Sequence, residues 1–84
     1  MTLEEAKISL DRYGETGVPT GSFLQAVLSN DLMDAVGRAD DTSLLNLHRI
    51  CMHVYNELPS DCWGSREKVK AFIEKKREAL GAGA

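Results

Sequence analysis

The stretch "SLLNLHRICMHVYNEL", Ser43–Leu58, decides the fold, because it carries the most regular apolar pattern in the chain. Apolar side chains recur there at the spacing of an α-helix, at Leu44, Leu47, Cys51, Val54 and Leu58. Ile50 and Tyr55 lie beside this stripe, and Pro59 follows, where a helix cannot continue. The pattern predicts the longest helix of the chain from about Ser43 to Leu58, with Asp41 or Thr42 as its cap.

The N-terminal segment also has the pattern of a helix. Thr2 and Glu5 form a capping box, T-x-x-E, at its start. A short apolar stripe follows at Leu3, Ala6, Ile8 and Leu10 and runs up to Tyr13. We expect this helix to end at Gly14.

Residues 22–39 contain both a helix start and an internal break. The apolar spacing begins after Ser22, which we expect to be at or just after the start of the helix. Asn30 tolerates a left-handed backbone, and Asp31 can cap a new turn. This segment is therefore predicted to be one kinked helix or two short helices.

The last helix is expected to begin at Ser65, whose side chain can cap it. Its predicted buried stripe is Val69, Phe72, Ile73 and Leu80, and Gly81 is the expected stop, with residues 80–84 a flexible tail. No run of β-branched residues indicates a sheet. The predicted fold class is all-α, a compact bundle of four to five short helices in a single domain, residues 1–84.

Size and charge narrow the function. A chain of 84 residues has a small core, which favours a binding module or a protomer of a homo-oligomer over an enzyme. A net charge of −3 argues against broad nucleic-acid binding, which needs a basic face. No apolar run approaches the roughly 20 residues that span a membrane, and the N-terminus lacks a signal-peptide pattern. We expect a cytoplasmic protein with two reduced cysteines.

A glycine-rich stretch, "YGETGVPTGSF", Tyr13–Phe23, raises the question of phosphate binding. It is not a Walker motif, because no lysine precedes Ser22 and a helix, not a strand, comes before it. The backbone amides of Gly21, Ser22 and Phe23 at a helix N-terminus could still hold an anion. The alternative is a simple turn, shaped by Pro19 and Gly21, with Thr20 or Ser22 as helix cap.

A second Gly-Ser helix start lies in "DCWGSREK", Asp61–Lys68. Here Arg66 and Lys68 add positive charge near Ser65, and Trp63 adds an aromatic ring. A helix start, cations and an aromatic side chain together could hold a phosphate and stack a base. The alternative is that Trp63 folds back onto the core as a hydrophobic staple.

Other chemistry has weak signals. His48, Cys51, His53 and Cys62 have the wrong spacing for a closed zinc site, and no C-x-x-C pair exists. No G-x-S-x-G elbow is present. The acidic residues between Asp31 and Asp41 are more simply helix caps and a solvated face. We therefore predict no metal, no cofactor and no catalytic residue.

The stretches "GVPTGSFLQAVLSNDLMDAVGRAD" and "VYNELPSDCWGS" resemble a group of small proteins from tailed phages and prophages. These share G-x-P-x-G-S-F-L, then G-R-A-D, then Y-N-x-x-P-x-x-C-W-G-S before a last helix. The resemblance runs from about Gly17 to Phe72 and departs at Thr20, where a second proline is more usual. It implies a phage protein of the host cytoplasm, and small phage proteins often counter host defence.

Two functional hypotheses follow. The first is a non-enzymatic protein that sequesters a phosphate-bearing nucleotide signal, with candidate ligand-binding residues Gly21, Ser22, Phe23, Arg38, Tyr55, Trp63, Ser65 and Arg66. The second is an inhibitor that contacts a host defence or takeover target, as anti-CRISPR proteins do, through the acidic residues 31–41 or an exposed apolar face. A helix-turn-helix-like DNA regulator is a third reading, which the acidic pI disfavours.

Overall fold

A computed structural model describes residues 1–82 of the chain, and every regular element in that range is helical. Six α-helices and one 3₁₀ turn follow one another as α1 (Leu3–Thr16), α2 (Ser22–Leu28), α3 (Leu32–Arg38), α4 (Asp41–Leu45), α5 (Leu47–Glu57), η1 (Ser60–Cys62) and α6 (Arg66–Ala82). The all-α prediction is confirmed, but the described residues form six helices rather than four to five. The Cα radius of gyration of 12.5 Å is close to the roughly 12 Å of a compact chain of this length.

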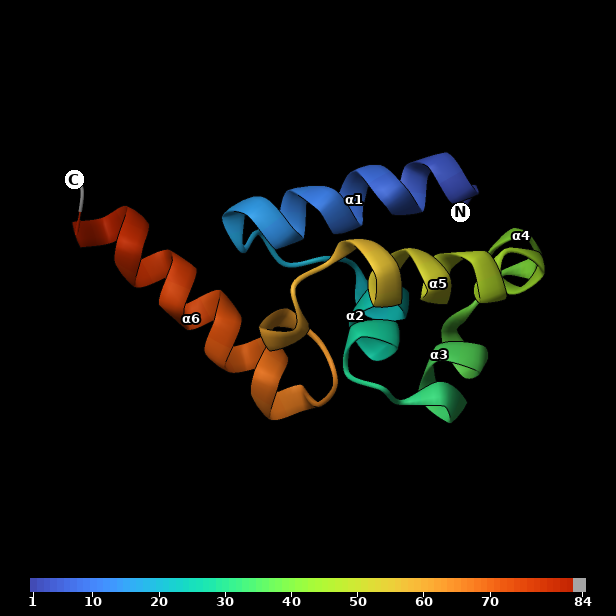
Figure 1. Ribbon diagram of the computed structural model, residues 1–84. Helices are drawn as coiled ribbons and strands as arrows, with labels where there is room; N and C mark the ends of the chain where they lie inside the picture. The colour runs from blue at the N-terminus through green and yellow to red at the C-terminus, as the bar shows by residue number, and fades with distance from the viewer. Residues whose placement is uncertain (83–84) are drawn as a thin grey trace.

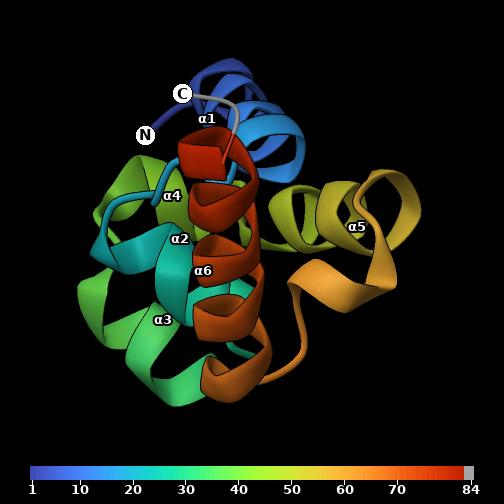
Figure 2. The ribbon, with the colours of Figure 1, turned by 90° about the vertical axis from the view of Figure 1, so that its left-hand side faces the viewer.

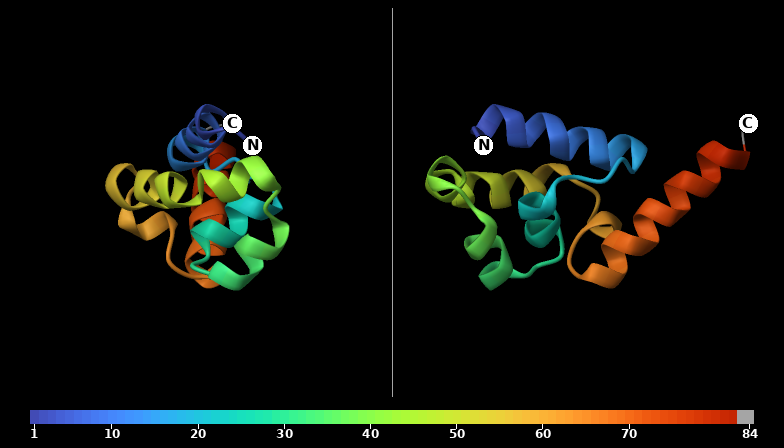
Figure 3. Two further views of the ribbon diagram at one scale, coloured as in Figure 1. Left: turned by 90° about the vertical axis from the view of Figure 1, so that its right-hand side faces the viewer. Right: turned by 180° about the vertical axis from the view of Figure 1, so that it is seen from behind.

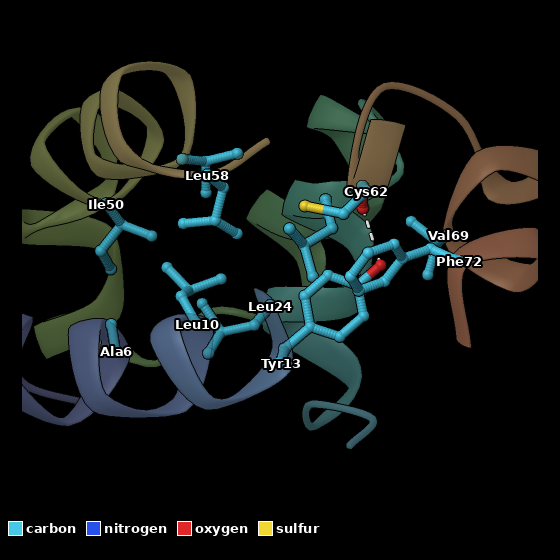
Figure 4. Close-up of a cluster of buried hydrophobic side chains, with 11 residues drawn as sticks. Ala6, Leu10, Tyr13, Leu24, Ile50, Leu58, Cys62, Val69 and Phe72 are labelled. Carbon is cyan, nitrogen blue, oxygen red and sulfur yellow. Dashed lines mark hydrogen bonds between the residues drawn. The ribbon is translucent and has the colours of Figure 1, made fainter. Parts of the chain in front are cut away.

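Tyr13 is the largest fully buried side chain of the hydrophobic core. Its hydroxyl donates a 2.6 Å hydrogen bond to the Cys62 carbonyl, and its ring lies 5.1 Å from that of Phe72, as Figure 4 shows. Side chains of five elements surround it. We call this cluster the main core: Ala6, Leu10, Tyr13, Leu24, Leu28, Ile50, Val54, Leu58, Cys62, Val69 and Phe72.

The helices are arranged around this core without a sheet or a regular bundle axis. α1 lies along α5, and α6 runs beside α2 and projects away from the body at its C-terminal end (Figures 1 and 3). In Figure 2, where the left-hand side of the Figure 1 view faces the reader, α6 lies in front of α2. α3 and α4 lie at the opposite end of the molecule from the C-terminus (Figure 1).

Helix α1 begins as predicted but ends later. The Thr2–Glu5 capping box is present, so that prediction is confirmed. The expected stop at Gly14 is wrong, because the helix continues to Thr16 and ends at Gly17, whose φ of 74° favours glycine. Ile8 is exposed, since the buried face continues from Ala6 through Leu10 to Tyr13.

Residues 22–39 form two short helices, as one of the two predicted forms. Helix α2 starts at Ser22, but neither Thr20 nor Ser22 caps it; Gly21 is its cap and makes no side-chain hydrogen bond. Asn30 has a left-handed φ of 58°, and the Asp31 side chain accepts from the Asp34 amide. Both predictions for the break between α2 and α3 are confirmed.

The predicted long helix from Ser43 to Leu58 is divided at Asn46. This residue has φ −100° and ψ 4°, and its side-chain amide donates to the Thr42 carbonyl, 2.9 Å away. Such a local side-chain bond competes with regular helix geometry. The cap of α4 is Asp40, not Asp41 or Thr42, because its carboxylate accepts from the Ser43 amide at 2.7 Å.

Helix α6 is the longest in the described residues, with 17 residues, so the prediction for Ser43–Leu58 is wrong on this point as well. Ser65 caps it by accepting from the Lys68 amide, as predicted. The helix does not stop at Gly81 but includes Ala82, and Leu80 is exposed rather than buried. Residues 83–84 of the expected tail lie outside the described residues.

Candidate functional site

The two Gly-Ser helix starts do not face the same space. The Gly64 amide donates to the Leu28 carbonyl at 2.7 Å, which places the start of α6 at the C-terminal end of α2. Ser22 is at the other end of α2, about 9 Å away along the helix axis. Within one chain, the amides after Gly21 and those after Gly64 therefore do not form a common anion site.

Neither start has the form of a separate anion site. Gly21 and Ser22 are exposed, while Phe23 is half-buried against the main core. At the other start, the Ser65 hydroxyl is engaged as the cap of α6, and the Lys68 ammonium donates to the Ser60 carbonyl. Direct ligand contact by Gly21, Ser22, Phe23 or Ser65 stays a prediction.

Arg38 and Arg66 meet at one carboxylate, Asp34. Arg38 Nε lies 2.9 Å from Asp34 Oδ1, and Arg66 Nη2 lies 3.0 Å from Asp34 Oδ2. The same Nη2 lies 3.0 Å from Asp31 Oδ2. These carboxylates raise the pKa of Arg66, and the Asp34 amide together with Arg66 lowers the pKa of Asp31. Arg66 is therefore oriented through one nitrogen, and its other donors are directed elsewhere.

Tyr55 and Trp63 do lie side by side, with ring centroids 6.0 Å apart. They line a cavity of about 220 Å³ together with Val27, Asn30, Cys51, Met52 and Val54. Trp63 packs against the main core, as the staple alternative expected, while Tyr55 is exposed. The Trp63 indole N–H is buried without an acceptor among the described residues.

A further cavity lies between α2 and α6, and of its lining residues only Arg66 was predicted as a site residue. We call it the α2–α6 groove; it has a volume of about 340 Å³ and is lined by Gln25, Ser29, Arg66, Val69, Lys70, Ile73, Glu74 and Arg77. This volume is within the range of small-molecule pockets. Val69 and Ile73 form an apolar floor, and three cations and one carboxylate surround it.

Ser29 lines this groove, but its hydroxyl oxygen is buried and solvent does not reach it. The residue is only 7% exposed, and its Oγ has no hydrogen-bond partner among the described residues. A buried hydroxyl without a partner costs free energy, on the order of 1–3 kcal/mol.

Helix α2 separates the two cavities. Gln25 and Ser29, the C-cap of α2, are four residues apart and share one face, whereas Val27 lies on the opposite face and Asn30 follows the end of the helix. The first pair lines the α2–α6 groove and the second lines the aromatic cavity. The predicted cation Arg66 and the predicted stacking pair Tyr55–Trp63 thus belong to different cavities.

Sequence reasoning missed Gln25, Ser29, Lys70 and Arg77. A signal was present in α6, where Arg66, Lys70 and Arg77 recur at i, i+4 and i+11 beside the buried Val69 and the half-buried Ile73. Gln25 and Ser29 could not be found from the sequence in this way, because the face of α2 that lines the groove depends on which helix packs against α2.

The described residues contain no group of three His, Cys, Asp or Glu side chains that could hold a metal ion. His53 instead lies 2.7 Å from Asp11, and Cys62 is buried in the main core. In the same part of the chain, no helix is long and apolar enough to cross a membrane. No protein-family model, curated protein or solved structure matches this chain.

Proposed function

We propose that the protein is a non-enzymatic binding protein for a phosphate-bearing nucleotide, which occupies the α2–α6 groove. The observation that carries this proposal is the composition of the groove wall. With Arg66 already paired to Asp31 and Asp34, Lys70 and Arg77 still outnumber the remaining carboxylate, Glu74, in a protein whose net charge is −3. A local excess of positive charge on an acidic protein favours an anionic ligand.

The polar groups of the groove suit a phosphate ester. Arg66 is oriented by Asp31 and Asp34 through Nη2, so its remaining donors lose little freedom on binding. The Gln25 amide on α2 can bind a further phosphate oxygen or a sugar hydroxyl. The apolar floor at Val69 and Ile73 would cover the sugar.

A phage origin gives this binding a role. The resemblance to small phage and prophage proteins suggests that the protein sequesters a nucleotide signal of host defence in the host cytoplasm. Sequestration needs tight binding and no catalytic group. Self-association remains part of this proposal, and light scattering of the purified protein measures it.

Calorimetry against a panel of cyclic dinucleotides, cyclic trinucleotides and cyclic ADP-ribose tests the function. We expect at least one member to bind with a dissociation constant of about 1 µM or lower. Lys70→Gln should weaken that binding about tenfold or more, because it removes a charge-assisted hydrogen bond. Lys75→Gln, an exposed cation of α6 outside the groove, is the matched control. If no member of the panel binds, the proposal is wrong.

A second candidate function is supported by the exposed apolar side chains of α3 and α4. These are Leu32, Met33, Val36, Leu44 and Leu45. Such side chains suit an inhibitor that contacts a host protein. The acidic residues 31–41 have less support as the contact surface of such an inhibitor. Asp31, Asp34 and Asp40 already accept hydrogen bonds within the chain. A stoichiometric partner in a host lysate that is lost in Leu45→Glu would favour this function.

A further inference from the structure

A second cavity lies beside the α2–α6 groove, next to the loop that precedes α2. This loop cavity has a volume of about 190 Å³ and is lined by Thr16, Gly17, Val18, Pro19, Ile73, Arg77 and Leu80. Two of these residues, Ile73 and Arg77, also line the groove. The two cavities are therefore neighbours along one face of α6.

The loop cavity differs from the groove in its chemistry. Arg77 is its one charged residue, and it stands at the junction of the two cavities. Val18 and Leu80 are 46% and 66% exposed, so two large apolar side chains face water there. Pro19 adds a third apolar surface. This cavity suits an uncharged group with apolar faces.

The wall of the loop cavity is fixed by a close contact with α6. The Gly17 amide donates to the Tyr13 carbonyl at 2.8 Å, which ends α1. A Cβ at Gly17 would lie 2.4 Å from the Lys76 Cβ, so the loop backbone is pressed against α6. The cavity is thus bounded on one side by backbone rather than by a long side chain.

The spacing along α6 sets the size of the occupant. Lys70 and Arg77 are about 10 Å apart along the helix axis, and Leu80 is about 5 Å beyond Arg77. If a phosphate is held between Lys70 and Arg77, a ring joined to that phosphate through one sugar can reach the loop cavity. Mononucleotide-sized molecules have these dimensions.

We infer that the α2–α6 groove and the loop cavity together bind one ligand, with its phosphate at Lys70 and Arg77 and its uncharged ring against Val18, Pro19 and Leu80. This inference rests on the proposed function, because the groove must first bind a phosphate. It adds that the ring contributes to affinity and that the glycine- and proline-containing loop recognises it. The aromatic cavity at Tyr55 and Trp63 then has no part in this ligand.

A comparison of ribose 5-phosphate with AMP tests the inference, because the two differ by the base. Amide chemical shifts of the full chain, titrated with each, give two dissociation constants. We expect AMP to bind about tenfold more tightly, the effect of removing about 55 Å² of apolar surface from water. The additional shifts with AMP should fall on residues 16–19 and around Leu80.

The variant Leu80→Ser separates the ring from the phosphate. Since Leu80 is exposed, the fold should tolerate the change; AMP should lose most of its advantage and ribose 5-phosphate should bind as before. Leu45→Ser, an exposed leucine of α4, is the matched control and should change neither constant. Equal binding of both compounds would overturn this inference and leave the proposed function standing. Binding of neither, together with no binding in the cyclic nucleotide panel, would overturn both.

Discussion

The main core and the segment of residues 31–45, which we call the α3–α4 segment, stabilise their helices by different means. The main core draws side chains from α1, α2, α5, η1 and α6, and none of them comes from α3 or α4. In the α3–α4 segment, Ala35 and Ser43 are the buried residues. Two small side chains bury too little apolar surface to stabilise two helices of seven and five residues.

In the α3–α4 segment, hydrogen bonds and ion pairs of carboxylates compensate for the small buried apolar surface. Asp31 caps α3 and Asp40 caps α4, each through a backbone amide. Arg66 connects the start of α3 to α6 through Asp31 and Asp34. Since such surface contacts are individually weak, this segment should open before the main core does. The helices of the main core are thus stabilised by buried apolar surface, whereas α3 and α4 are stabilised by the hydrogen bonds of their caps.

The largest expected effect comes from truncating one leucine in each region. Leu10 is 0% exposed in the main core, whereas Leu45 is 87% exposed on α4. Leu10→Ala should reduce the free energy of unfolding by about 3 kcal/mol, because it removes buried methyl groups and leaves a cavity. Leu45→Ala should change it by less than about 0.5 kcal/mol. Urea denaturation of both variants measures the difference.

A large loss in Leu45→Ala would contradict this comparison. It would mean that the exposed leucine is buried in solution, as in a self-associated form. Repeating the denaturation at two protein concentrations distinguishes the two cases, because only an associated form gives a concentration-dependent midpoint.

A second prediction compares glycines of the two regions. Gly17 is buried at a φ of 74° with Lys76 against it, whereas a Cβ added at Gly37 in α3 would meet nothing within 4 Å beyond its chain neighbours and the backbone of its own helix. Gly17→Ala should destabilise the protein by about 2 kcal/mol or more. Gly37→Ala should stabilise it by about 0.5 kcal/mol, since alanine favours a helix. Thermal unfolding followed by circular dichroism gives both values, and an equal response at both positions would contradict the assignment of Gly17 as the C-cap.

Local signals predict the helix caps best. The Thr2–Glu5 box, the Asn30–Asp31 break and the Ser65 cap are contacts within a few residues of one another, so the sequence contains both partners. The errors concern contacts between distant segments. Gly14 has the sequence signature of a helix end, but it lies inside α1, where it faces Leu58 and Pro59 from a distant part of the chain.

The candidate site is harder to predict for the same reason. The Gly-Ser starts at Ser22 and Ser65 look alike in sequence, but the Gly64–Leu28 hydrogen bond places them at opposite ends of α2. Arg66, predicted as a site cation, does line the groove. Its partners Gln25 and Ser29 come from a helix 37 or more residues earlier, and no local pattern pairs them with α6.

The smallest expected effect is the response of the α3–α4 segment to acid. The Ser43 amide and hydroxyl contacts, together with the N-terminal ammonium of Met1, lower the pKa of Asp40 from 3.8 to about 2. Because the folded-state pKa is lower than that of the unfolded chain, ionised Asp40 stabilises α4 above pH 3.8, and this contribution is lost as the pH falls toward 2. Asp31, whose pKa is also lowered, should act in the same direction on α3.

Amide chemical shifts between pH 6 and pH 2 measure this effect residue by residue. The Ser43 amide should shift with a midpoint well below 3.8, while the amide of Leu24 in the main core, which has no carboxylate within five residues along the chain, stays unchanged over the range in which α4 responds. Asp40→Asn is the matched control, because asparagine caps a helix but does not titrate there. A Ser43 midpoint at the ordinary aspartate value in the wild-type chain would mean that the Asp40 carboxylate does not hold the start of α4. The helical form of α3 and α4 would then need another explanation. Burial of their exposed apolar side chains against a partner would be the first to examine.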